Sequence, residues 1–275
     1  MNMKINLEKY REKTIVIKYG GNAMINEELK AAVMEDMVFL SEAGIRVVLV
    51  HGGGPEINQM LQRVGKEPKF INGLRYTDKE TMDIVTMILA GKVNKSLVAL
   101  IHKNRGKAIG LCGVDGGMLQ VKKHQGELDL GMVGDIITVD GSSLEMALDQ
   151  NLIPVIATLG VDEKGEIYNI NADTAAAAIA GALKAEKLIS MTDIKGVLLD
   201  KDNEETLLSR IKTRDVAKLI GDGVISGGMI PKIQSCVEGL EQGVKEAMII
   251  DGRVRHAVLG ALESEEAAGT VFYTE

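Results

Sequence analysis

The segment Arg46–Pro55, RVVLVHGGGP, decides the fold. An apolar run rich in valine leads through a histidine into three glycines, and the proline then opens a stretch with apolar residues at helical spacing. The segment Thr14–Gly21, TIVIKYGG, has the same order of apolar run and glycines. Buried strands that alternate with helices are typical of a mainly parallel sheet with helices on both faces. We therefore predict an α/β fold.

The alternation of strands and helices continues along most of the chain. Further strands are predicted at Ala108–Leu111, Ile153–Ala157, Leu188–Met191 and Ala247–Ile250. Helices are predicted at Asn26–Ala43, Pro55–Val64, Asp78–Lys103, Ser142–Asn151, Ala172–Leu183, Thr213–Gly221 and Lys232–Gly243. Polar, glycine-containing stretches at Lys122–Ile137 and Asp162–Gly165 predict β-hairpins. We expect two lobes on one continuous sheet, with their boundary near the helix Ala172–Leu183.

The composition is that of a soluble globular protein and gives no sign of a nucleic-acid partner. The 275 residues are 45% hydrophobic and 26% charged, with a formal net charge of −7. With no tryptophan, five tyrosines and three phenylalanines, the chain offers few side chains on which bases could stack. The charged segment Met1–Lys13 is unlike a signal peptide, and we expect no membrane span. Cys112 and Cys236 show no CxxC spacing and suit a reducing compartment, so we expect a cytoplasmic protein.

Four glycine-rich segments lie where α/β sheets bind ligands, beyond the carboxyl ends of strands or ahead of a helix. They are Tyr19–Asn22, His51–Pro55, Cys112–Gly117 and Gly227–Met229. Glycine allows backbone N–H groups to approach phosphate or carboxylate oxygens closely. Because the chain is acidic overall, such amides and local positive charge must hold any bound anion. We therefore predict an anion site at this edge of the sheet.

The motifs of the common phosphate-binding folds are absent. The sequence has no GxxxxGK[ST] motif, no GxGxxG after the first strand, and neither the HRD nor the DFG motif of protein kinases. The four histidines lack metal-ligand spacing, so we expect no metal site built by the protein. Phosphate is therefore expected to bind without a P-loop.

Four charged residues lie within or near these elements. Lys18 closes the first strand, and its ammonium group is expected to project into the ligand crevice. Lys232 lies in the first turn of a predicted helix, where the helix dipole disfavours a cation unless an anion binds in front of it. Asp173 begins a helix and is either a simple capping residue or a functional carboxylate. Arg75 follows a turn and is either a carboxylate clamp or a surface arginine.

Seven motifs, in order along the chain, resemble the amino-acid kinase superfamily and, within it, the N-acetyl-L-glutamate kinases. They are KYGGNAM (Lys18–Met24), VHGGGPEIN (Val50–Asn58), NGLRYTD (Asn72–Asp78), AGKVNK (Ala90–Lys95), NINADTAAAAIA (Asn169–Ala180), TDIKGVL (Thr192–Leu198) and GGMIPKI (Gly227–Ile233). The resemblance implies a three-layer αβα sandwich on a largely parallel sheet. It also implies an acetylglutamate-binding and dimerising lobe at residues 1–180 and an ATP-binding lobe at residues 181–275. The implied activity is the phosphorylation of the γ-carboxylate of N-acetyl-L-glutamate by ATP, in arginine biosynthesis.

The resemblance also implies roles for individual positions. Lys18 and Lys232 match the two lysines that neutralise the transferring phosphoryl group, and Asp173 matches the aspartate that holds both lysines. The positions that match substrate-binding residues are Gly53, Gly54, Arg75 and Asn169. The positions that match the nucleotide-binding part are Gly20, Gly21, Asp193 and Gly228. Mg²⁺ is expected to arrive with ATP and to keep several of its waters.

Two alternatives to this activity stay open at this point. Aspartokinases, glutamate 5-kinases and carbamate kinases share the glycine loops, but the NGLR and NINAD motifs fit acetylglutamate better, and we expect no C-terminal regulatory domain of the aspartokinase type. The other alternative is a catalytically inactive amino-acid sensor on the same scaffold. The presence of Lys18, Lys232 and Asp173 disfavours the sensor.

The regulatory signs in the sequence conflict. Arginine-inhibited members of the superfamily carry an N-terminal helix that links dimers into a hexamer, and that helix is longer than the segment Leu7–Lys13 found here. The segment Asp251–Thr270 nevertheless resembles the region that binds arginine in those enzymes. We expect a homodimer at least, with an arginine-inhibited hexamer as the alternative.

Overall fold

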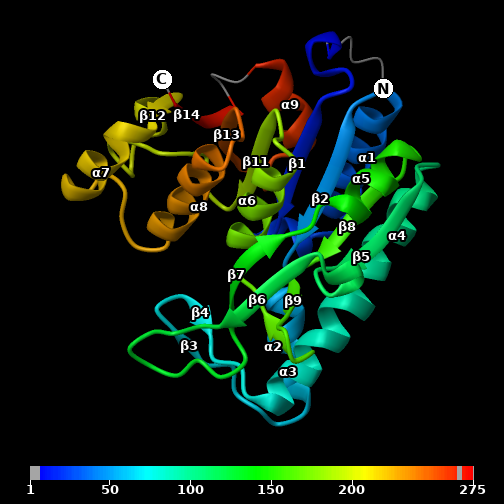
Figure 1. Ribbon diagram of the computed structural model, residues 1–275. Coiled ribbons are helices and arrows are strands. Elements are labelled where there is room, and N and C mark those ends of the chain that lie inside the picture. The colour runs from blue at the N-terminus through cyan, green and yellow to red at the C-terminus, as the bar shows by residue number, and fades with distance from the viewer. Residues whose placement is uncertain (1–6, 265–267, 275) are drawn as a thin grey trace.

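An eight-stranded sheet forms the centre of the molecule, with the strand order β12-β14-β13-β11-β1-β2-β8-β5 (Figure 1). In this computed structural model, which describes residues 7–264 and 268–274, neighbouring strands of the sheet are parallel except for β13 and β14. The strands are β1 (Thr14–Tyr19), β2 (Arg46–His51), β5 (Ala108–Cys112), β8 (Ile153–Ala157), β11 (Lys187–Thr192), β12 (Arg210–Lys212), β13 (Glu246–Asp251) and β14 (Gly269–Tyr273). The expectations for Met1–Lys13 and Asp251–Thr270 fall partly on residues outside the described ranges.

Alternate residues of the inner strands face opposite sides of the sheet and enter two separate apolar cores. In β1, Ile15 and Ile17 belong to one core and Val16 to the other, and Leu49 and Val48 of β2 divide in the same way. Because both faces are covered, these strands are continuous apolar runs rather than alternating ones.

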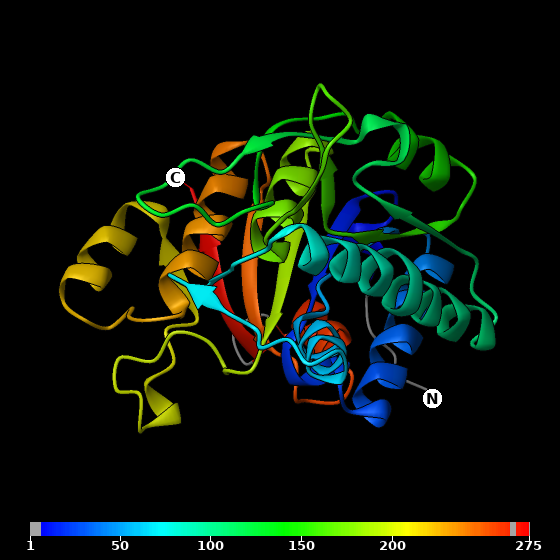
Figure 2. The same cartoon turned by 90° about the horizontal axis from the view of Figure 1, so that it is seen from below.

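Helices lie on both sides of the sheet, as Figure 2 shows. On the side of the first core are α1 (Glu27–Glu42), α2 (Gly54–Arg63), α3 (Lys79–Thr86), α4 (Asn94–Lys103) and α9 (Ala257–Glu263). On the side of the second core are α5 (Ser142–Asp149), α6 (Ala172–Ala182), α7 (Thr213–Gly221) and α8 (Met229–Glu241). The three-layer αβα fold predicted from the sequence is therefore confirmed.

Two smaller sheets lie beside the central one. The first has the order β10-β9-β6-β7 and consists of β6 (Leu119–Lys123), β7 (Gly134–Val139), β9 (Leu159–Val161) and β10 (Ile167–Asn169). Both predicted hairpins are confirmed within it, since β6 pairs with β7 and β9 with β10 in antiparallel register. The second is the hairpin of β3 (Phe70–Ile71) and β4 (Leu74–Arg75). Its two-residue turn, Asn72-Gly73, has positive φ at both positions, as a type I′ turn requires.

Some elements differ from the predictions. The predicted helix Asp78–Lys103 is interrupted by a π-helix, η3 (Met87–Val93), between α3 and α4. Helix α8 begins at Met229, three residues before its predicted start, so Lys232 is its fourth residue. Three further elements were not predicted: β12, β14 and α9. The short 3₁₀ helices were also not predicted; they are η1 (Glu8–Tyr10), η2 (Gly21–Met24), η4 (Asp115–Gly117) and η5 (Glu204–Thr206).

The continuous helical segment Lys79–Lys103 is long and apolar enough to cross a membrane by length and composition, and an 18-residue window within it has a mean hydropathy of 1.7. Length and composition alone do not make it a membrane span, so the expectation that the chain has none stays a prediction. The segment is a helix of the fold's interior, because Val85, Leu89, Leu97 and Ile101 are 0–2% exposed and belong to the first core. Its apolar character is explained by packing against α1, β5 and β8.

Candidate active site

Three charged residues from different elements meet near the carboxyl end of β1. The Nζ atom of Lys18, in β1, lies 3.1 Å from Oδ1 of Asp173, in α6. The Nζ atom of Lys232, in α8, lies 3.2 Å from Oδ2 of the same carboxylate. The hydroxyl group of Ser190, in β11, donates to Asp173 Oδ1 at 3.2 Å. The three residues that the sequence analysis assigned to catalysis are thus brought together.

Asp173 does not cap its helix. Asn171 is the N-cap of α6, and its side chain accepts hydrogen bonds from the backbone N–H groups of Asp173 and Thr174. The Asp173 carboxylate is therefore free to bind the two lysines, and the simple capping interpretation is wrong. Burial raises the pKa of this carboxyl, but the attraction of Lys18 and then of Lys232 outweighs it and holds the pKa at about 2. One ionised carboxylate thus faces two ammonium groups, which leaves positive charge for an anion.

The glycine loop after β1 lies against this cluster. A Cβ atom on Gly20 would be 2.9 Å from the Lys18 ammonium nitrogen, so a larger residue would displace that group. Gly21 has φ of +70°, and a Cβ atom there would be 2.7 Å from Oδ1 of Asp193, which follows β11. Gly20 is therefore close to Lys18, and Gly21 is close to Asp193. Gly228, the N-cap of α8, lies four residues before Lys232 and faces open space.

A cavity of about 200 Å³ lies beside the charged cluster, at the end of β2. Its lining includes Gly52, Gly53, Gly54, Arg75, Asn169 and Ala172, the residue before Asp173. All four predicted substrate-binding positions are in this lining. A Cβ atom on Gly53 would be 2.6 Å from Cδ2 of Leu89 in η3, so the wall of the cavity accommodates only glycine at this position without a shift.

Arg75 is a buried cation, with 7% of its surface exposed. Its Nη2 donates to the carbonyl oxygen of Gly54 at 3.3 Å, and its guanidinium group stacks on the ring of Phe70 at 4.6 Å. Its buried Nη1 has no hydrogen-bond partner among the described residues. Burial lowers the pKa of Arg75 to about 10, so the group is still charged at neutral pH. A buried, charged and incompletely paired guanidinium group indicates a binding site for a carboxylate.

Asn169 is connected to Arg75 through a threonine that the sequence analysis missed. Asn169 Nδ2 donates to Thr77 Oγ1 at 3.3 Å, and the Thr77 hydroxyl donates to the carbonyl oxygen of Arg75 at 2.9 Å. Thr77 is fully buried and lies in the NGLRYTD motif, which could have drawn attention to it. Ser190 gave no such signal, because it is one residue within an apolar strand.

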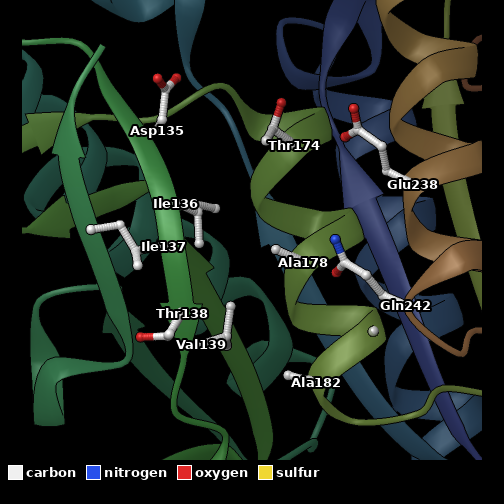
Figure 3. A pocket seen from close by; sticks show the side chains of 11 residues that line it. Asp135, Ile136, Ile137, Thr138, Val139, Thr174, Ala178, Ala182, Glu238 and Gln242 are labelled. Atoms are coloured by element: carbon white, nitrogen blue, oxygen red, sulfur yellow. The ribbon is translucent and has the colours of Figure 1, made fainter. Parts of the chain in front are cut away.

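The glycine segment after β5 and the groove beside β7 are poor candidates for an anion site. The glycines of Cys112–Gly117 are outside the cavity lining, and a Cβ atom on Gly113 would be 2.0 Å from the carbonyl oxygen of Leu159, so close packing explains that glycine. Figure 3 shows a larger groove, of about 500 Å³, between β7, α6 and α8. The only charged groups among the described residues that line it are Asp135 and Glu238, both acidic. No group of three or more His, Cys, Asp or Glu among the described residues is arranged to hold a metal ion.

Comparison with known proteins agrees with this geometry. The amino acid kinase family matches residues 13–251 of the chain. The acetylglutamate kinase of Brachyspira hyodysenteriae is 54% identical over 269 residues, which are 98% of this chain and 93% of that protein. The acetylglutamate kinase of Haemophilus ducreyi is 55% identical, with 98% and 94% of the two chains covered.

A solved structure resembles the fold over nearly its whole length. The N-acetylglutamate synthase of Neisseria gonorrhoeae, complexed with coenzyme A and N-acetyl-glutamate, matches with a TM-score of 0.84 and 25% identity. The match covers 98% of this chain, which spans 61% of the length of the synthase. The chain therefore belongs to the amino acid kinase family, and within that family its sequence groups with the proteins named acetylglutamate kinase.

Proposed function

We propose that this chain transfers the γ-phosphoryl group of ATP to the γ-carboxylate of N-acetyl-L-glutamate, as a step of arginine biosynthesis. The observation that carries the proposal is the buried Arg75 in a small cavity directly beside the Lys18–Asp173–Lys232 cluster. A carboxylate site next to a site for a more highly charged anion suits an acidic acceptor and ATP. Membership of the amino acid kinase family and the similarity to acetylglutamate kinases support the same assignment.

In the proposed acceptor site, Arg75 binds the α-carboxylate of acetylglutamate through Nη1, the guanidinium nitrogen without a protein partner. The backbone N–H groups of Gly53 and Gly54 lie at the start of α2 and bind the acceptor near its reacting end. Asn169, which also lines the cavity, contributes a further polar contact. These contacts would hold the γ-carboxylate toward the lysine cluster.

In the proposed transfer step, a γ-carboxylate oxygen of acetylglutamate forms the new bond to phosphorus, and the bond to the β,γ-bridging oxygen breaks. ADP leaves and an acyl phosphate remains. The carboxylate is already ionised at neutral pH, so no general base is required. Lys18 and Lys232 neutralise charge on the transferring group, and Asp173 positions both ammonium groups.

The proposed nucleotide site is on the other side of β1. Gly20, Gly21 and Gly228 lie near the phosphates, and Asp193 belongs to the wall of the nucleotide site. ATP would enter as a substrate together with Mg²⁺, which would help to neutralise the phosphate charge and would keep several of its waters. In this assignment residues 1–180 form the acetylglutamate lobe and residues 181–275 the ATP lobe. We place the enzyme in the cytoplasm, which is consistent with its two free cysteines, and assign it a homodimer as the smallest assembly.

The test is ADP release from MgATP with four acceptors supplied separately: N-acetyl-L-glutamate, glutamate, aspartate, and bicarbonate plus ammonia. We expect turnover with N-acetyl-L-glutamate alone. Turnover with another acid would contradict the assigned acceptor, whereas no turnover from folded protein would favour an inactive sensor. Each reaction is repeated with L-arginine, because inhibition would support arginine as a feedback inhibitor.

A further inference from the structure

A buried polar network lies next to the three glycines that follow β2 and outside the lining of the substrate cavity. His51, the last residue of β2, and Asn94, the first residue of α4, are both fully buried. The His51 Nδ1 atom is 2.8 Å from the carbonyl oxygen of Gly52, and its Nε2 atom is 3.1 Å from Nδ2 of Asn94. The proposed reaction gives none of these side chains a role.

The neighbours of Asn94 fix the orientation of its amide group. Its Oδ1 is 3.0 Å from the ammonium group of Lys95, which can only donate, so this atom is the oxygen. The other side of the amide is 2.8 Å from the carbonyl oxygen of Val155 and 3.1 Å from that of Leu111, which can only accept. The atom that faces His51 Nε2 is therefore the donating nitrogen.

These contacts allow a single tautomer of His51. Its Nδ1 faces a carbonyl oxygen and must donate, while its Nε2 faces the amide nitrogen of Asn94, which cannot accept a proton. Both constraints place the proton on Nδ1. Burial, in addition, lowers the pKa of His51 to about 4, so the ring is neutral in the range where the enzyme would work.

The donated hydrogen bond fixes a peptide group of the substrate cavity. In a trans peptide, the carbonyl group of one residue and the N–H group of the next point in opposite directions. With the Gly52 carbonyl held by His51, the Gly53 N–H must point away from the ring. Gly52 and Gly53 line the cavity and His51 does not, so this N–H lies on the cavity side.

We infer that His51 and Asn94 are positioning residues, which fix the Gly52–Gly53 peptide so that the Gly53 N–H donates to the acceptor substrate. Lys95 has a supporting role, because its ammonium group also donates to the carbonyl oxygen of Gly110 at 2.9 Å and is thereby tied to β5. The substrate part of this inference rests on the proposed function. The tautomer part does not.

The tautomer is measured by NMR of the intact protein labelled with ¹⁵N-histidine. Long-range ¹H–¹⁵N spectra distinguish a protonated Nδ1 from a protonated Nε2, and the loss of a signal in His51→Asn assigns His51 among the four histidines. We expect a protonated Nδ1 and an unprotonated Nε2 from pH 8 down to pH 5. A protonated Nε2 would overturn the inference, whether or not the protein shows kinase activity.

The role of Asn94 is tested in the same spectra with Asn94→Asp. Both oxygens of an aspartate accept, so Nε2 of His51 would then have to carry a proton. We expect the Nε2 signal to change to that of a protonated nitrogen. An unchanged His51 signal in this variant would contradict the assigned role of Asn94.

The effect on the substrate is tested with two variants of His51. Asn can place its amide nitrogen where Nδ1 was and donate to the Gly52 carbonyl, whereas Gln places its amide nearer the position of Nε2. We expect His51→Gln to raise both the Kd and the KM for acetylglutamate roughly tenfold, as for one lost hydrogen bond to a charged group, with the KM for MgATP unchanged. His51→Asn should stay within about threefold of the wild type.

The control is His102→Gln, the same substitution at an exposed histidine of α4, which should leave all constants unchanged. Thermal unfolding identifies any variant that does not fold. If a His51 variant does not fold, the spectra of the wild-type protein still test the tautomer of His51. Equal losses in folded His51→Asn and His51→Gln would overturn the positioning role. Failure of wild-type protein to bind acetylglutamate would instead contradict the proposed function and leave the tautomer result standing.

Discussion

At the scale of single residues, the site contains more positive side chains than negative ones. Asp173 neutralises only one of the two lysines that contact it, and Arg75 has no ion-pair partner among the described residues. Isolated buried charges are unfavourable, and such groups are retained where a ligand completes them. We therefore propose that the lysines and the arginine bind different anions, since Arg75 lines the cavity and the lysines pair with Asp173 beside it.

Removal of either lysine should lower turnover without unfolding the protein. For Lys18→Ala and Lys232→Ala we expect kcat to fall roughly 10²- to 10³-fold, about 3–4 kcal/mol, as for the loss of one group that stabilises transition-state charge. The measurement is ADP release, with circular dichroism as the test of folding. Lys245→Ala, which removes an exposed lysine paired with Glu186, is the control. Near-wild-type turnover in a folded Lys18 or Lys232 variant would refute the role of that lysine.

Replacement of the guanidinium group of Arg75 should affect the acceptor rather than ATP. Lysine keeps the charge in Arg75→Lys but cannot bind a carboxylate with two parallel hydrogen bonds. We expect the KM for acetylglutamate to rise roughly tenfold or more, with little change in the KM for MgATP. Arg63→Lys, at an exposed position at the end of α2, serves as the control. An unchanged KM for acetylglutamate would remove the clamp assignment.

Much of the site could be anticipated from residue types, but not all of it. Lysine beside glycine at a strand end, and arginine after a turn, are recognisable because these residue types bind anions. The sequence left the function of Asp173 open, since an aspartate in the first turn of a helix is also a good cap. Only the structure shows that Asn171 supplies the cap. Ser190 and Asn94 depend on contacts 17 to 61 residues apart, which no local pattern reveals.

At the scale of elements, the apolar strands were predicted within about one residue of their ends, because runs buried on both faces have a distinctive composition. The polar edge strand β12 was not predicted, since Arg210–Lys212 shows no apolar run, and the buried strand β14 was not predicted either. The helix Asp78–Lys103 was predicted as a single element. Its π-helical segment contains Leu89, which packs close to Gly53, and helical periodicity encodes neither the π-helix nor that contact.

The contact between α1 and α9 should make stability depend on pH. Asp36 of α1 is fully buried, its Oδ1 is 2.6 Å from Nδ1 of His256, and its Oδ2 has no partner among the described residues. Burial, opposed by the hydrogen bond from His256, raises the pKa of Asp36 to about 6. An aspartate of the unfolded chain titrates near pH 4, so its stabilising contribution is complete below that pH and is lost as the pH rises to about 6.

Asp36→Asn removes this titration and keeps an oxygen that can accept from His256. Between pH 4 and pH 7, we expect the wild type to lose stability relative to this variant, by an amount on the order of 3 kcal/mol at most. Urea unfolding at several pH values measures the difference, with Asp83→Asn at an exposed position of α3 as the control. A difference that does not change with pH would contradict the raised pKa of Asp36.

At the scale of the whole molecule, the sheet extends outward from β1 in two directions. Segments up to Ala157 build the side β2-β8-β5, and segments from Lys187 onward build the side β11-β13-β14-β12. The charged cluster lies where these two halves meet, with Lys18 on the central strand and Asp173 in the helix between them. Sequence periodicity predicted the elements but not this strand order, which depends on pairings between distant segments.

The assembly is the property of the whole molecule that the sequence left in conflict. Strand β5 is the outer strand on one side of the sheet and is an apolar, partly exposed segment, AIGLC, of the kind through which chains associate. Leu7, which precedes the short helix η1, and Tyr10, its last residue, are 6% and 4% exposed and pack into the core of their own chain. This part of the N-terminal segment is thus used within the subunit rather than presented to another dimer.

We therefore expect a dimer, with the mass of two 29.6 kDa chains, in size-exclusion chromatography with light scattering. Arginine should change neither the mass nor the rate of ADP release, because the resemblance ties inhibition to a hexamer linked through its N-terminal helices. The double variant Leu7→Ser and Tyr10→Ser tests whether these side chains pack within their own subunit. We expect it to lower the melting temperature without changing the mass of the assembly. A hexamer that arginine inhibits would show that the N-terminal segment links dimers, and a monomer would contradict association through the β5 edge.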